Sequence, residues 1–170
     1  AISVHGGSGF IMEYKCQRLF RDARIFSIYE GTTQLQVVAA IRYVTNGTYL
    51  GIIKEMLEKE VAPEFQALKE RVAKMVEKYE DAINYVKAAG NNDLHDFLAR
   101  RLYEMTAEII MSLLILDDAT RAPELFAKSA NVYVRYAEGT VAGHYAYIKE
   151  FKAEDLVDFL AAAPEEAPAE

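Results

Sequence analysis

The stretch FQALKERVAKMVEKYEDAINYV, residues 65–86, decides the fold class of this 170-residue chain. Its apolar side chains recur at steps of three or four residues, with one adjacent pair, and therefore line one side of a helix. They are Phe65, Leu68, Val72, Met75, Val76, Tyr79, Ile83 and Val86. A single apolar stripe on a long, otherwise charged helix is typical of a helical bundle. Pro63, just before it, marks either a kink or the start of the helix.

Similar spacing continues toward the C-terminus. Gly90-Asn91-Asn92 breaks the first stripe, and the next apolar pattern predicts a helix over 93–117. Pro123 suits a first helical turn and is expected to begin a helix that reaches Gly139. We expect a further helix through His144 and Phe151, and a short amphipathic segment over Leu156–Leu160.

Toward the N-terminus the pattern predicts helices over 12–24 and 33–44, and only the opening residues 1–4 lack the helical period. Thr32 or Thr33 can cap the second of these helices, and Asn46-Gly47 can end it. The predicted fold is therefore all-α.

Three segments are predicted. Residues 1–47 form the end of one helical domain, residues 48–160 form an appended helical bundle, and residues 161–170 form a flexible tail rich in proline and glutamate.

Composition excludes several classes of function. The net charge of −7 and pI near 5.1 argue against nucleic acid or an anionic membrane as partners. The single cysteine excludes a disulfide framework and favours a reducing compartment such as the cytoplasm. Three widely separated histidines predict no metal site. The sequence holds neither a long apolar run nor a signal peptide.

The residues with the strongest chemical signal lie near the start of the chain. A glycine cluster, residues 6–9, opens a loop, and Glu30 stands between Tyr29 and Gly31 before the helix 33–44. Glycines allow close backbone approach to a ligand, and free N–H groups at a helix start suit phosphate or a carbonyl oxygen. The glycine cluster lacks the third glycine of the dinucleotide fingerprint. A plain turn and a solvated carboxylate are the alternative interpretations.

Four motifs then occur in a fixed order: GGSGF at 6–10, EY at 13–14, RLFRDARI at 18–25 and IYEGTTQLQ at 28–36. Together they resemble the closing signature of acyl-CoA dehydrogenases. The later helices resemble the additional C-terminal helical domain of larger members of that family.

The resemblance implies a catalytic base. In the family, the glutamate of the IYEGT motif removes the α-proton of an acyl-CoA thioester, and Glu30 occupies that position. The thioester oxygen there accepts a hydrogen bond from the backbone N–H of the same glutamate. Tyr29 and Gly31 are the corresponding substrate-binding positions.

The resemblance also implies FAD as the cofactor. Thr32 and Gln34 resemble residues that contact it, and Gly6 and Gly7 resemble residues that touch the adenosine-diphosphate part of an FAD held mainly by a neighbouring subunit. Family members commonly have glutamine where this chain has Ser3, so that contact is not implied. The expected site includes no metal.

For the parent enzyme, the resemblance implies α,β-desaturation of acyl-CoA in fatty acid β-oxidation, electron transfer to an electron-transferring flavoprotein, and a homodimer or homotetramer. Because the chain starts inside a motif without methionine, we expect a fragment that is inactive alone. The alternative is a catalytically idle helical dimerisation or interaction module. Arg21, Asp22 and Arg24 are expected to form a structural charge network, and Cys16, Phe20 and Phe26 to be core residues.

Overall fold

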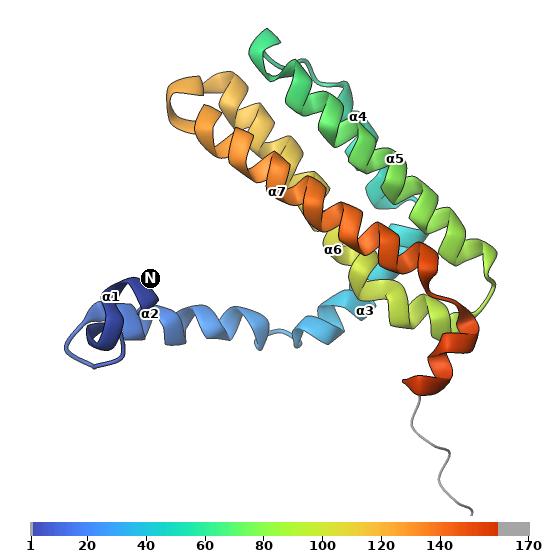
Figure 1. The fold of residues 1–170 in the computed structure, drawn as a ribbon, viewed down its shortest axis with the longest axis horizontal. Coiled ribbons are helices and arrows are strands. Elements are labelled where there is room, and N and C mark those ends of the chain that lie inside the picture. The colour runs from blue at the N-terminus through green and yellow to red at the C-terminus, as the bar shows by residue number, and fades with distance from the viewer. Residues whose placement is uncertain (1, 160–170) are drawn as a thin grey trace, which may run out of the picture. The chain divides into compact units, whose positions relative to one another are not determined.

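The computed structural model describes residues 2–159, and all regular structure within that range is helical (Figure 1). The all-α prediction is confirmed. The chain divides into two compact units, residues 1–39 and residues 40–170. The predicted tail 161–170 and Leu160 lie outside the described residues.

The first unit holds short helices joined by turns. It contains α1 (Ile2–His5), a 3₁₀ helix (Gly6–Gly9), α2 (Lys15–Arg24), a second 3₁₀ turn (Ile25–Ser27) and the beginning of α3 (Thr33–Thr45). Residues 2–5 are helical although their pattern predicted no helix. The chain folds back so tightly here that a Cβ at Gly9 would lie 2.5 Å from the carbonyl oxygen of Ile2. Glycine permits this close approach.

Most large apolar side chains of this unit are exposed. Cys16 is buried, and its Sγ lies 3.3 Å from the carbonyl oxygen of Gly9, as expected of a core residue. Phe20 and Phe26, which were predicted to be core, are 62% and 72% exposed. That prediction was wrong because the short helices of this unit bury too little surface to cover both rings.

The second unit is a bundle. After α4 (Thr48–Glu58), the 3₁₀ helix Pro63–Phe65 leads into three long helices, α5 (Gln66–Ala88), α6 (Asn92–Arg121) and α7 (Pro123–Glu150). These three pack on one another, and α4 packs against α5 and α6 (Figure 1). Pro63 thus starts a helical segment and kinks none. Gly90, with φ of +60°, ends α5, and the Asn91 side chain caps α6 by accepting from the N–H of Leu94.

The predicted stripe of 65–86 forms the bundle core. All eight of its apolar residues are buried. Among them, fully buried Tyr79 has its Oη 2.7 Å from Oγ1 of Thr106 on α6, which also lies 2.8 Å from the carbonyl oxygen of Leu102. One polar pair therefore crosses an otherwise apolar interface between α5 and α6.

The helix predicted to end at Gly139 instead continues to Glu150, so the separate helix through His144 and Phe151 was wrong. Burial of Val134, Ala137, Val141 and Ile148 on one face continues across the glycine and outweighs its helix-breaking tendency. After α7, the 3₁₀ helix Ala153–Asp158 takes the place of the predicted segment at 156–160.

An aromatic cluster fixes the end of α7 on α6. The Phe151 ring stacks on Phe97 at 4.7 Å and on Tyr147 at 5.5 Å, and Phe159 lies 4.9 Å from Phe97. Within residues 2–159, no helix is long and apolar enough to cross a membrane, and no group of His, Cys, Asp or Glu could hold a metal ion.

Candidate active site

The Glu30 loop has an unusual backbone. Glu30 has φ of +53°, the only positive value at a non-glycine residue described, and Gly31 follows with φ of +101°. The left-handed region costs a residue with a Cβ roughly 1–2 kcal/mol. The Gln36 side chain holds the turn, because its Nε2 donates to the carbonyl oxygen of Glu30 at 2.8 Å. This geometry presents the glutamate at the entrance to α3, which begins at Thr33 as predicted.

The side chains of this loop are open to contact. Glu30 is exposed, and Tyr29 is 47% exposed, with its ring 5.9 Å from that of Phe26. A Cβ at Gly31 would lie 3.1 Å from Cβ of Leu35, so the position favours glycine both for its φ and for its space. Exposed Tyr29 and Glu30 thus share one short turn with half-buried Gly31, and this turn could contact a ligand.

The residues proposed to touch FAD fall into two groups within the first unit. Thr32 and Gln34 are exposed beside Glu30. Gly6 and Gly7 are exposed at the other end of α2, and a Cβ on either would meet nothing within 4 Å. Between the two groups in the sequence lies ten-residue α2, about 15 Å long at 1.5 Å per residue. Accessible backbone at the glycines fits a dinucleotide contact.

The predicted charge network takes a different form. Asp22 pairs with Arg18 at 4.0 Å, while an Nη1–H of Arg24 donates to the Ser27 hydroxyl. Arg21 takes part in neither contact, so within residues 2–159 the prediction of one network through Arg21, Asp22 and Arg24 was wrong. Helical spacing explains the change, because residues four apart on α2 face each other.

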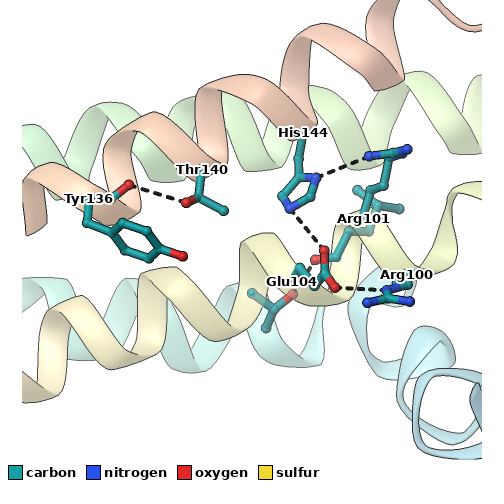
Figure 2. A network of polar contacts seen from close by, with 8 residues as sticks. Arg100, Arg101, Glu104, Tyr136, Thr140 and His144 are labelled. Atoms are coloured by element: carbon teal, nitrogen blue, oxygen red, sulfur yellow. Dashed lines mark hydrogen bonds and ion pairs between the residues drawn. The ribbon is translucent and has the colours of Figure 1, made fainter. Parts of the chain in front are cut away.

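A second polar cluster joins α6 to α7 in the bundle (Figure 2). Nε2 of His144 lies 3.0 Å from Oε2 of Glu104, and Nδ1 lies 3.5 Å from Nη1 of Arg101. Because a guanidinium can only donate, Nδ1 must accept, and the ring proton on Nε2 then donates to Glu104. Arg100 donates to the other Glu104 oxygen at 2.8 Å, and the Arg101 guanidinium lies 3.4 Å from the centre of the Tyr147 ring.

Burial lowers the pKa of His144 below its ordinary value, against the opposing effect of Glu104. The neutral ring that this favours matches the donor and acceptor pattern. Sequence inspection did not reveal this cluster, because His144 stands 40 residues from Glu104 (144 − 104) and no short motif joins them. Its contacts hold α6 against α7, which is a structural role.

Two more polar links of the same kind hold α7 in place. The Tyr133 hydroxyl donates to Glu108 at 2.8 Å, and burial, reinforced by that carboxylate, raises the pKa of Tyr133 to about 12. On the α5 side, Asp81 accepts from Tyr145 and pairs with Lys149, which lowers the pKa of its carboxyl group. Interhelical polar contacts therefore add to the apolar core of the bundle, and the Glu30 turn carries the candidate chemistry.

Two family models together match residues 1–156 of this helical chain. The family model for the acyl-CoA dehydrogenase C-terminal domain matches residues 1–44, and the model called acyl-CoA dehydrogenase C terminal matches residues 45–156. This chain belongs to the acyl-CoA dehydrogenase family. The predicted boundary between 47 and 48 stays a prediction.

Similarity to individual proteins agrees with this family membership. The chain is 26% identical to butyryl-CoA dehydrogenase of Syntrophomonas wolfei over 159 residues, covering 87% of this chain and 26% of the relative. It is 58% identical over 36 residues to a subunit of the caffeyl-CoA reductase–Etf complex of Acetobacterium woodii, covering 21% of this chain and 10% of that subunit. It thus spans about a quarter or less of these relatives.

A solved structure is also similar. The crystal structure of an acyl-CoA dehydrogenase family protein from Porphyromonas gingivalis matches 67% of this chain and 98% of its own, with 38% identity and a TM-score of 0.63. The identity and the shared helical fold support the same family membership.

Proposed function

We propose that this chain supplies the catalytic base and part of the substrate and flavin contacts of an acyl-CoA dehydrogenase. In the proposed reaction, the Glu30 carboxylate takes the α-proton of an acyl-CoA thioester, a hydride leaves the β-carbon, and the Cα–Cβ double bond forms. FAD, when bound, accepts that hydride. The observation that carries the proposal is the left-handed Glu30-Gly31 turn within the IYEGT motif.

The turn supports the proposal because its strain has no evident benefit for folding. A glycine at position 30 would adopt φ of +53° at lower free energy, yet the chain has a residue with an ionisable side chain there. Strained backbone of this kind clusters at active sites. The exposed Tyr29 and the half-buried Gly31 could then position an acyl chain beside the carboxylate.

FAD is the proposed cofactor. The exposed Thr32 and Gln34 would contact it near Glu30, and the exposed Gly6 and Gly7 would contact an FAD held mainly by a neighbouring subunit. The two groups lie on either side of α2 in the sequence. An electron-transferring flavoprotein is the proposed electron partner, and the name of the caffeyl-CoA reductase–Etf relative supports it.

Reduction is a second candidate direction for the same site. Relatives named as a caffeyl-CoA reductase–Etf complex subunit, 3-(aryl)acrylate reductase and acryloyl-CoA reductase (NADH) match this chain over 36, 36 and 44 residues at 58%, 53% and 43% identity. In that direction Glu30 would return a proton to the α-carbon while a hydride enters at the β-carbon. The residues of the turn serve either direction, so the redox partner would decide between them.

The test compares Glu30→Gln with the wild type in the longest natural polypeptide that carries this sequence. Glutamine keeps the size of the side chain and removes the base. We expect both proteins to bind FAD, and only the wild type to bleach the flavin absorbance with acyl-CoA or to oxidise the reduced flavin with an enoyl-CoA.

A matched control is Glu55→Gln, which changes another exposed glutamate, on α4, and should leave turnover unchanged. Bleaching that survives Glu30→Gln would overturn the assignment of the base. A wild-type protein that binds no FAD would instead favour the idle interaction module. The acyl-CoA that bleaches fastest would name the substrate.

A further inference from the structure

One face of α7 is exposed and uncharged over most of its length. From Leu125 to Ala146, residues at alternating steps of four and three point away from the bundle, and we call them the α7 stripe. Its members are Leu125, Ser129, Val132, Tyr136, Gly139, Gly143 and Ala146, all exposed. Leu125, Val132 and Tyr136 are 69%, 71% and 62% exposed. The spacing is that of a helix seam that packs on another helix.

The two glycines of the stripe are unexplained by the chain's own packing. Gly139 and Gly143 lie inside a continuous helix without positive φ, and a Cβ on either would meet nothing within 4 Å. Each costs the helix about 1 kcal/mol relative to alanine. A glycine on an exposed helix face allows another backbone to approach closely.

Val132 and Tyr136 of the stripe border an open groove. Lys128, Ser129, Val132, Tyr133 and Tyr136 line a shallow hollow of about 490 Å³ on this face. Large side chains and the groove therefore occupy the first half of α7, while glycine and alanine occupy the second half. This division is what an antiparallel copy of the same helix would match.

We propose that the α7 stripe is a homodimer interface, in which α7 packs antiparallel to α7 of a second copy. Around a two-fold axis, Tyr136 would face Gly139 of the second copy, Val132 would face Gly143, and Ser129 would face Ala146. Tyr136 and Val132 then each meet a glycine. Such alternation lets facing layers interdigitate, and a two-fold interface requires a self-complementary surface.

The charges at the two ends of the stripe fit this pairing. Lys128 and Glu150 border opposite ends, and neither has an ion-pair partner among the described residues. The antiparallel arrangement brings Lys128 of each copy near Glu150 of the other. Lys149 lies in the same region but is held by its own Asp81 at 2.9 Å, which keeps its charge on the α5 side.

The first experiment measures association of the full chain by sedimentation velocity over a wide range of concentration. We expect a reversible dimer. Gly143→Leu should raise its dissociation constant by about tenfold or more, because the added side chain overpacks a close helix contact. Gly51→Leu on α4 is the matched control, since Gly51 is also exposed in a helix with nothing within 4 Å of its Cβ.

A charge exchange tests the register. Lys128→Glu or Glu150→Lys alone should weaken the dimer at low salt, whereas the double variant should restore it. Circular dichroism and thermal unfolding would show that each variant is folded, and Gly143→Leu should be at least as stable as the wild type when monomeric.

Three results would overturn the proposal. They are a chain that stays monomeric at every concentration, a dimer unaffected by Gly143→Leu, and single charge reversals that the double variant does not rescue. The second result would point to association through the exposed apolar residues of 1–39 instead.

Discussion

The buried pair of Tyr79 and Thr106 gives the sharpest stability prediction. Burial raises the pKa of Tyr79 to about 12, which reports how completely its hydroxyl group is removed from water. Thr106→Val keeps the shape of the side chain but leaves that hydroxyl without its partner at 2.7 Å. An unpaired buried hydroxyl costs about 1–3 kcal/mol, so we expect the free energy of unfolding to fall by about 2 kcal/mol.

The reverse change should cost less. Tyr79→Phe removes one hydrogen bond, but the Thr106 hydroxyl can still donate to the carbonyl oxygen of Leu102 at 2.8 Å. We expect a loss of about 1 kcal/mol, and a similar loss for the double variant, which leaves no unpaired group. The single losses therefore should not add, and the coupling should be about 2 kcal/mol.

Urea denaturation of the wild type, both single variants and the double variant measures this cycle. Valine is β-branched like the threonine that it replaces at position 106, so the helix propensity of α6 changes little. Additive losses, or a smaller loss for Thr106→Val than for Tyr79→Phe, would refute the reasoning. Either result would mean that Tyr79 finds another partner or water.

Three further predictions concern the bundle. Gly90→Ala should lower the free energy of unfolding by about 1 kcal/mol in urea, because alanine is strained at φ of +60°, and an unchanged value would contradict this. Burial holds the pKa of His144 below 6.5. As the pH falls, the imidazole is therefore protonated in the unfolded chain before it is protonated in the folded chain. The stability contributed by the neutral His144 ring is complete above pH 6.5 and is lost below it. The midpoint of urea unfolding should therefore fall more in the wild type than in His144→Gln between about pH 7.5 and about pH 5.5. In an absorbance titration, Tyr133→Phe should remove one phenol with a midpoint near pH 12, and loss of a phenol near pH 10 would contradict the Glu108 contact.

Helical period predicted the elements of the bundle well. The stripe from Phe65 to Val86 became the buried face of α5, and Gly90 ended it, because both signals are local. Gly139 misled the prediction, since its local cost of about 1 kcal/mol was outweighed by core contacts of residues before and after it. Boundaries set by local chemistry were predictable, and a boundary decided by tertiary packing was not.

The candidate site was predictable only as a set of residues. The motif indicated Glu30 and its neighbours. The sequence did not indicate the left-handed backbone at Glu30 or the hydrogen bond from the Gln36 side chain that holds it. The contacts of His144 and Tyr79 were also invisible, because their partners lie on other helices. Pairings of this kind depend on how helices pack, and periodicity does not specify them.

At position 30, the backbone conformation and the side chain favour different residues. Selection for folding alone would favour glycine or asparagine there, since both adopt a positive φ at lower free energy. Replacing the glutamate would thus stabilise the chain while abolishing its acid–base group. A relative with glycine or asparagine in its place would gain stability at this turn and would lack the proposed base.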